Sequence, residues 1–244
     1  MAGETVKTSG ICLAVHPWSQ TSHVVIWLTP GGKVKTVVKG AVRAKSAFLG
    51  QYDLNYTCEI LYYARAKSEL HALRECSPVK LRENMRGDYR CIAASDYCRH
   101  LAGELAPAGN DSAAWFSALE NTLDAIGGKP APARLISRII AFELEVLALS
   151  GLAPDFTGFD EQAEWSAFSV EEGRFCTDGR RFLRIPPQVA QCLNAPRGEY
   201  PMQILLDAAR VIGVFYQFHL DCASDVRRTV LRMISTTTHG SGET

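Results

Sequence analysis

Five cations lie within thirteen residues of the N-terminal third of the chain, and side chains of this type bind phosphate groups. They are Lys33, Lys35, Lys39, Arg43 and Lys45. No acidic residue occurs between Glu4 and Asp53, so no carboxylate close in sequence neutralises them. Cations that neutralise phosphates release counterions, and about five contacts on a single strand give a slope of about −3.5 for log K against log salt. The alternative is a solvated strand edge that lysines protect from aggregation.

Further cations and two aromatic side chains could extend this surface. The cations are Arg65, Lys67 and Arg74. Trp18 and Phe48 fall in expected loops and could stack on bases, which contributes ~1–3 kcal/mol per base. The alternative is that they belong to the core, because half of the strand positions in a barrel point inward. No segment resembles a reader of base edges in the major groove, so the predicted binding is independent of nucleotide sequence.

The sequence contains no credible active site. Its six histidines form no H-E-x-x-H, H-x-H or Cys–His pattern, and there is no phosphate-binding P-loop and no G-x-S-x-G segment. The eight cysteines are scattered without C-x-x-C spacing, which favours buried free thiols and a reducing cytoplasm. We therefore expect a protein that is not an enzyme, with no signal peptide and no membrane span; a metal-independent hydrolase remains a remote alternative.

The charge of the chain is divided unequally along its length. The net charge is zero over 244 residues. Residues 1–80 carry ten Lys and Arg against five acids, and residues 81–244 carry sixteen against twenty-one. Such asymmetry indicates a charged ligand on one part of the chain. The N-terminal part is therefore the expected polyanion-binding part.

Five runs of strand length position the basic segment, with residues 1–9 expected to be loose. The runs are 10–15, 23–28, 33–38, 54–63 and 70–76. Their alternation is typical of half-buried antiparallel strands, and Pro30 and Gly31 predict a hairpin turn. Five short strands in about 75 residues fit a five-stranded OB-fold barrel, although periodicity alone does not exclude an SH3-like barrel. We expect this barrel to be a domain over residues 1–80.

From residue 81 the spacing of apolar residues becomes helical, which predicts an α-helical domain over 81–244. Helices are expected at 85–105, 112–126, 133–150, 201–220 and 224–234. Residues 153–187 form an irregular insertion in which only short strands near 168–170 and 174–175 are expected. The fold class is therefore α+β, a barrel followed by helices.

Two motifs resemble those of the bacterial recombination mediator RecO family. One is V-V-K-G-A-V-R-A-K-S at 37–46, directly after a hairpin, and the other is F-E-L-E-V-L-A-L-S-G-L-A-P-D-F at 142–156. A helix with Tyr97 and Glu104 between them also fits, and the resemblance covers about 8–234. It implies an N-terminal OB-fold, a helical domain with a zinc-binding insertion, and binding and annealing of single- and double-stranded DNA in recombinational repair.

The resemblance also implies protein partners and a location. These are RecR and the acidic C-terminal tail of single-stranded-DNA-binding protein, which together permit loading of the recombinase RecA in a cytoplasmic, nucleoid-associated setting. The tail would bind near the helix that carries Arg134 and Arg138, because a carboxylate beside a buried Phe favours an arginine next to an apolar groove. Family members often carry arginines directly before F-E-L, where this chain has Ile140 and Ala141. The alternative is two arginines on a solvated helix face.

The chain departs from the family in its insertion. Family members with zinc carry two C-x-x-C pairs after the P-D-F segment, but here only Cys176 is present, with Gly179 three residues later. Structural zinc needs four ligands. We therefore expect no zinc and no other cofactor, with the insertion held by its aromatic residues Phe159, Trp165, Phe168 and Phe175.

Two functions from different classes follow. The first is a DNA-binding mediator whose basic barrel face lowers the repulsion between strands. The second is a protein-interaction adaptor whose barrel binds acidic peptides instead of nucleic acid.

Overall fold

The computed structural model describes residues 4–65, 68–109, 112–176, 182–220 and 224–236, which belong to two compact units. One unit comprises Met1–Asn84 and Cys98–Asp124, and the other comprises Met85–Tyr97 and Ala125–Thr244. The expected division after residue 80 stays a prediction, since compactness does not test which segment folds alone. Within the described part, no helix has the length and apolar character needed to cross a membrane.

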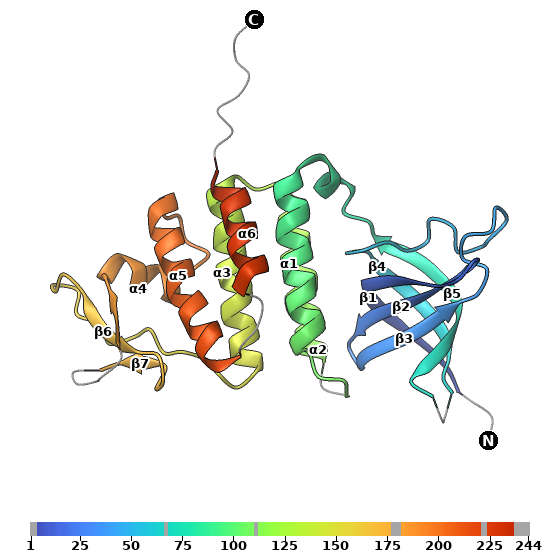
Figure 1. Ribbon diagram of the computed structural model, residues 1–244, viewed down its shortest axis with the longest axis horizontal. Coiled ribbons are helices and arrows are strands. Elements are labelled where there is room, and N and C mark those ends of the chain that lie inside the picture. Colours follow the sequence, from blue (N-terminus) through green and yellow to red (C-terminus); the bar gives the residue numbers. More distant parts are fainter. Residues whose placement is uncertain (1–3, 66–67, 110–111, 177–181, 221–223, 237–244) are drawn as a thin grey trace, which may run out of the picture. The chain divides into compact units, whose positions relative to one another are not determined.

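The first unit contains a closed five-stranded barrel (Figure 1). Its strands are β1 (Thr5–Ser19), β2 (Ser22–Thr29), β3 (Gly32–Val38), β4 (Thr57–Tyr63) and β5 (Leu70–Lys80). They follow the order β1-β2-β3-β5-β4, and the β1–β4 pairing closes the barrel. Only the β3–β5 pairing is parallel. The predicted OB-fold barrel followed by helices is confirmed.

Strand β1 is longer than the sequence indicated. Its first half, from Thr5 to Ile11, pairs with β4, and its second half pairs with β2. The expectation that residues 1–9 are loose is therefore wrong for residues 5–9. The side chains of residues 5–9 are mostly polar and show no alternation of apolar and polar residues that would predict a strand. Their backbone nevertheless pairs with β4 and closes the barrel.

The inner faces of the strands fill the barrel. Trp27 is fully buried, and its indole Nε1–H donates to Thr36 Oγ1 at 2.9 Å, so the polar end of the ring is paired. Gly32 has a φ of +124°, and a Cβ there would lie 2.8 Å from the carbonyl oxygen of Gly109. Glycine is therefore required at the start of β3 by conformation and by space.

Two helical segments belong to the same unit as the barrel. They are the part of α1 (Tyr89–Leu105) from Cys98 onward and α2 (Ala113–Gly127) as far as Asp124. Arg99 donates to the carbonyl of Leu13 on β1. Arg82 donates from Nε to Asp124 Oδ1 at 2.7 Å, and Lys80 donates to the other oxygen, also at 2.7 Å. These contacts fix the end of β5 against α2.

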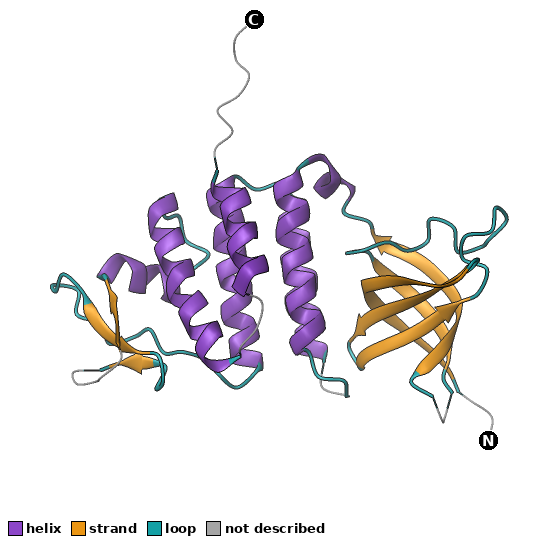
Figure 2. Ribbon diagram, in the orientation of Figure 1, coloured by secondary structure: helices purple, strands orange, loops and turns teal. Residues whose placement is uncertain are grey.

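The second unit is helical with a small sheet (Figure 2). After the short η1 (Glu83–Gly87), its helices are the start of α1, α3 (Pro132–Leu149), α4 (Pro187–Asn194), α5 (Met202–His219) and α6 (Ser224–Ser235). Its strands are β6 (Ser166–Ser169), β7 (Arg174–Phe175) and β8 (Phe182–Ile185), in the order β7-β6-β8. Proline opens α3, as it does α4, and Gly151 follows the end of α3 with a φ of +73°. Helix α4 and strand β8 were not expected from the sequence.

Candidate nucleic-acid interface

Three of the predicted phosphate-binding cations lie on the connection between β3 and β4. Lys39, Arg43 and Lys45 are exposed, and none has an ion-pair partner within the part of the chain that the structure describes. The connection is ordered by turns, in which the Arg43 N–H donates to Gly40 O at 3.2 Å. It is also fixed to the β1–β2 turn, because the Val42 N–H donates to Thr21 O at 3.4 Å. These three charges are therefore free to meet an external anion.

Trp18 lies at the same end of the barrel as Lys39. Ser19 pairs with Ser22 at the β1–β2 turn, and His23 on β2 pairs with Val38, the residue before Lys39. Trp18 was expected in a loop but lies within β1, and it is 63% exposed. The expectation of a loop at Trp18 was therefore wrong. The proline at position 17 had indicated that the strand ends before it. An exposed indole at the same end of a barrel as unpaired cations fits single-strand binding, which combines a basic surface with aromatic stacking.

Phe48 lies on the β3–β4 connection but packs inward. Its ring is half-buried against the barrel core, together with Tyr52. The Tyr52 hydroxyl is 2.8 Å from His23 Nδ1, so this part of the connection is attached to β2. Stacking of Phe48 on a base would require it to leave that contact, and its role in stacking stays a prediction.

Lys33 and Lys35 lie on β3 with intramolecular partners. Lys33 Nζ donates to Gly103 O at 2.9 Å, in the last turn of α1, where a cation is favourable. Lys35 Nζ lies 3.5 Å from Glu69 Oε2, with the two side chains 50% and 90% exposed. An ion pair this exposed is weak. A phosphate can therefore compete for Lys35 more readily than for Lys33.

A cavity of about 740 Å³ opens beside these two lysines. Its lining includes Ile26 and His71. The His71 ring stacks on Tyr62 with centroids 5.3 Å apart, and its Nδ1 accepts from the Arg65 N–H at 3.2 Å. Burial, with a smaller effect from the Arg65 charge, lowers the pKa of His71. The imidazole is thus neutral at pH 7 and adds no positive charge to the cavity.

Two of the three remaining predicted cations, Arg65 and Arg74, lie within the described residues. Arg65 is exposed just after β4. Arg74 is exposed on β5, with its guanidinium carbon 5.8 Å from the centre of the Tyr63 ring, a cation–π distance. Lys67 lies outside the described residues. The structure therefore brings Trp18 and Lys39 to one end of the barrel, with Arg43 and Lys45 on the connection that follows Lys39. Lys33 and Lys35 lie on β3, Arg74 lies on β5 and Arg65 lies just after β4.

The two arginines predicted to bind a partner differ in their surroundings. Arg134 is exposed on α3, forms an ion pair with Glu199, and lines a cavity of about 230 Å³ with Tyr200 and Leu205. Arg138, one turn further, is half-buried and does not line that cavity. Arg134 thus stands beside an apolar pocket, and the acid that occupies it was not foreseen from the sequence.

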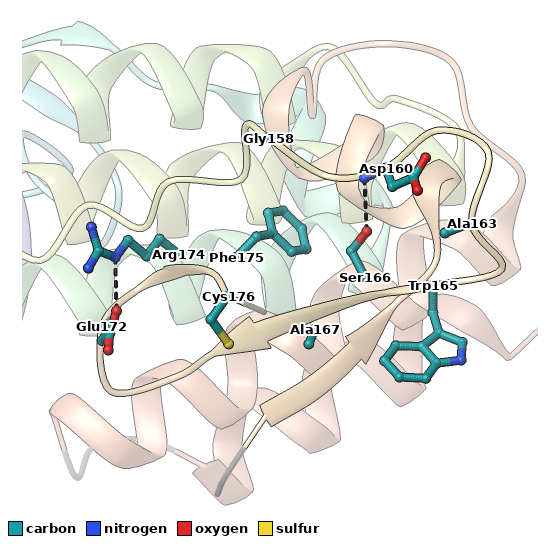
Figure 3. Close-up of a pocket in the computed structure, with 10 residues that line it drawn as sticks. All are labelled: Gly158, Asp160, Ala163, Trp165, Ser166, Ala167, Glu172, Arg174, Phe175 and Cys176. Atoms are coloured by element: carbon teal, nitrogen blue, oxygen red, sulfur yellow. Dashed lines mark hydrogen bonds and ion pairs between the residues drawn. The ribbon is translucent and has the colours of Figure 1, made fainter. Parts of the chain in front are cut away.

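The insertion of the second unit contains a cavity of about 580 Å³ (Figure 3). Its lining includes Trp165 and Cys176, and Arg174 Nε donates to Glu172 at 2.9 Å. The insertion packs through its aromatic rings: Phe168 lies 4.8 Å from Phe156 and 5.3 Å from Phe175 between centroids. The described residues contain no group of three or more His, Cys, Asp or Glu placed to hold a metal ion. The absence of zinc stays a prediction.

The barrel cysteines are buried and unreactive. Cys12 and Cys58 are fully buried, and Cys76 nearly so. Burial raises the pKa of the Cys12 thiol, and a hydrogen bond with Cys76 followed by burial raises that of Cys58. The thiolate is the reactive form, so these groups serve as core side chains. All cysteines in the described residues are free, as expected.

Comparison with known proteins assigns the chain to a family. Residues 1–82 match the model "Recombination protein O N terminal" and residues 86–178 match "Recombination protein O C terminal". The DNA repair protein RecO of Alkaliphilus metalliredigens is 29% identical over 178 residues, which is 70% of each chain. That of Roseiflexus sp. is 28% identical over 154 residues, covering 63% of this chain and 53% of the relative. That of Rhodopirellula baltica is 29% identical over 145 residues, covering 59% of this chain and 53% of the relative. The chain thus spans about half the length of these last two relatives. The chain belongs to the recombination protein O family.

Proposed function

We propose that this protein binds single- and double-stranded DNA through its barrel during DNA repair and recombination, and that it acts without catalysing a reaction. Membership of the recombination protein O family supports a role in DNA repair and recombination. The observation that carries DNA binding is the set of three exposed cations, Lys39, Arg43 and Lys45, without acidic partners among the described residues. The exposed Trp18 lies at the same end of the barrel as Lys39.

Binding by this surface relies on phosphates and stacking. Each cation that meets a phosphate releases counterions from the strand, which makes the affinity dependent on salt. Trp18 can stack on any base, because every base has a π-face. Lys35 adds a further contact when a phosphate displaces Glu69 from it. Affinity then comes from the backbone, and the surface selects no nucleotide sequence.

The finer steps of the proposed role follow from lowering the repulsion between phosphates. A basic surface that neutralises two backbones allows complementary strands to anneal. We include a RecR-like mediator as a partner and recombinase loading as the outcome, in a cytoplasmic, nucleoid-associated setting. The acidic tail of single-stranded-DNA-binding protein is proposed to place an apolar side chain in the pocket of Tyr200 and Leu205, with its carboxylate on Arg134.

A salt titration of fluorescent single-stranded DNA tests the barrel surface. The variant with Lys39, Arg43 and Lys45 all changed to Glu removes three phosphate contacts, so the slope of log K against log salt should become shallower by about 2. A matched control reverses three exposed cations away from the β3–β4 connection: Lys7 at the opposite half of β1, Arg174 and Arg197. The control should keep the wild-type slope. Equal affinity of wild type and triple variant, with unchanged circular dichroism, would remove the barrel from the proposal.

One observation favours the adaptor as a second candidate. Lys35 already binds a carboxylate, that of Glu69, so the barrel surface accepts this group. The same titration separates the candidates when an acidic peptide competes with the oligonucleotide. If DNA displaces the peptide at micromolar protein concentration, the result supports the DNA-binding function. If the surface binds the peptide and does not bind DNA, the result supports the adaptor.

A further inference from the structure

A basic groove lies between α5 and α6, within the half of the chain that carries the acidic excess. Its cavity has a volume of about 570 Å³. Four arginines line it, and no acidic residue does: Arg210, Arg227, Arg228 and Arg232. The sum of charges over residues 81–244 conceals this group, because that half of the chain carries more acids than cations.

The floor of the groove is apolar. Leu206 and Val214 on α5 and Leu231 on α6 line it, and Val214 is 41% exposed. Phe218 lies one turn beyond Val214 on the same helix and is 51% exposed. Exposed apolar side chains next to arginines favour a ligand that offers both flat apolar groups and negative charge.

Arg227 presents one nitrogen that its buried partner does not use. Its Nε and Nη2 donate to the two oxygens of Glu143 at 2.6 and 2.8 Å. Its Nη1 lies against the backbone of α5, where a Cβ at Gly213 would be only 2.8 Å from it. Gly213 and Arg227 both line the groove. Glycine in the middle of a helix is unfavourable by about 1 kcal/mol. Here the absence of a side chain at Gly213 leaves room for the guanidinium of Arg227 at the floor of the groove.

The other three arginines are available to a ligand. Arg210 pairs with Asp207 at 2.5 Å and Arg228 pairs with Asp225 at 3.4 Å, both within one helix and with exposed arginines. Such surface pairs contribute little, so an external anion can replace the acid. Arg232 has no ion-pair partner among the described residues.

We propose that the α5–α6 groove binds a second single strand of DNA, an inference that rests on the proposed function of the barrel. Phosphates would bind to Arg210, Arg228 and Arg232 on the two helices, and unpaired bases would lie against Val214 and Phe218. A duplex hides its bases, so the groove favours a single strand. An acidic peptide is the competing occupant, but the pocket at Arg134 already offers it an arginine beside a smaller apolar site.

A second strand site gives the chain a route to annealing. When two strands bind to one molecule, their encounter becomes intramolecular, and the effective concentration of each at the other rises to the millimolar range for short flexible connections. Neither site needs to recognise sequence, because complementarity is tested by the strands themselves. The barrel alone would give binding with little annealing.

The test counts strands on one protein molecule. Two non-complementary oligonucleotides, labelled with a donor and an acceptor dye, are mixed with the wild-type chain, and energy transfer reports their joint binding. Changing both Arg228 and Arg232 to Glu should reduce two bound strands to one, slow annealing about tenfold or more, and leave binding of the first strand in place. Arg227 is left unchanged because it stabilises the fold.

Controls separate this inference from the proposed function. Changing Arg174 and Arg197 to Glu reverses two equally exposed arginines of the same unit and should leave two strands bound. The Lys39, Arg43 and Lys45 variant should lose the other strand; if it keeps both while the groove variant keeps one, the groove inference stands and the barrel assignment fails. Two bound strands and unchanged annealing in the groove variant would overturn the inference. The inference would also be overturned if the groove variant lost the binding of an acidic peptide and still bound both DNA strands.

Discussion

Glu143 and Arg227 form a bidentate ion pair in the core of the helical unit. Glu143 is fully buried, and the side chain of Arg227 is 9% exposed. Glu143 Oε1 also accepts from the Tyr97 hydroxyl at 2.5 Å, and the Glu143 carbonyl accepts from the Tyr216 hydroxyl at 2.9 Å. Burial, and then the Glu143 charge, raises the pKa of Tyr97, so its hydroxyl stays a donor. This network joins α1, α3, α5 and α6.

The Glu143→Gln variant should lose much of the stability of the helical unit. The change leaves the buried Arg227 charge without a carboxylate, and breaking a buried pair this way costs about 3–5 kcal/mol. Urea unfolding followed by far-UV circular dichroism measures the loss. Glu145→Gln on the same helix is the control, because Glu145 is half-exposed and lies 3.9 Å from Arg197, and its loss should be about 1 kcal/mol or less. Equal losses in the two variants would contradict a central role for the pair.

The contact between Asp124 and Arg82 predicts an acid-sensitive step in the barrel unit. Burial acts to raise the pKa of Asp124, but the hydrogen bond from Lys80 and the Arg82 charge outweigh it, and the pKa is lowered. A carboxyl whose pKa is lower in the folded state adds stability above its unfolded value, about 3.9, and loses it as the pH falls through the folded value.

Unfolding of wild type and Asp124→Asn at pH 7 and pH 3 measures this step. The variant should be less stable at pH 7 by about 1–3 kcal/mol, because the Arg82 side chain is only 5% exposed and loses its carboxylate partner. The difference should shrink at pH 3, because this pH lies below the unfolded pKa of about 3.9 and the contribution of a carboxyl with a lowered folded pKa decreases as the pH falls below that value. A difference that stays constant between the two pH values would refute the assignment.

The barrel could be predicted from sequence because its signal is local. The strands β2, β3 and β4 could be predicted from the alternation of apolar and polar residues, and the hairpin from the turn at Pro30 and Gly31. That these strands close into an OB-fold barrel was implied by the family resemblance. The parallel β3–β5 pairing depends on residues more than thirty apart, which periodicity does not encode. Helix α4 has only eight residues, and β8 only four, so neither spans enough turns or alternations to show a period.

The sequence predicted which residues form the candidate site, but not which intramolecular partners these residues have. The sequence identified the cations of the candidate site, since charge is read directly from residue type. It did not reveal that Lys33 binds Gly103 or that Lys35 binds Glu69, because those contacts join segments 70 and 34 residues apart in sequence. It also missed the α5–α6 arginines. Their spacing at 227, 228 and 232 was visible, but only the fold shows that Arg210 lines the same groove.

The insertion should be stable without metal. Cys176 is the one cysteine between residues 153 and 187, and we propose that the aromatic contacts around Phe168 hold the insertion in place of a metal. We expect no zinc in purified protein and no change in melting temperature with a chelator. Phe168→Ala should lower the stability by about 3–5 kcal/mol, because the side chain is fully buried. One zinc per chain by atomic emission, lost together with folding on chelation, would overturn this prediction.

The ion pair of Arg134 with Glu199 should limit the affinity for an acidic peptide. Both side chains are exposed, at 60% and 82%, so the pair contributes about 0.2–1 kcal/mol, and a peptide carboxylate must displace Glu199 to reach Arg134. Glu199→Gln should therefore tighten the binding of an acidic peptide ending in Pro-Phe by up to about fivefold. Arg134→Glu should abolish it, whereas Glu172→Gln, which frees Arg174 in the same unit, should leave it unchanged.

Fluorescence anisotropy of the labelled peptide measures all three variants under one salt condition. A Glu199→Gln variant with wild-type affinity, together with an Arg134→Glu variant that still binds, would exclude this pocket as the peptide site. Tighter binding in Glu199→Gln alone supports competition, because the substitution removes the negative charge that pairs with Arg134 and creates no new cation. The response of Arg138→Glu then decides whether the half-buried neighbour takes part. Since Arg138 does not line the cavity, we expect its effect to be about threefold or less, the size of a weak electrostatic contribution.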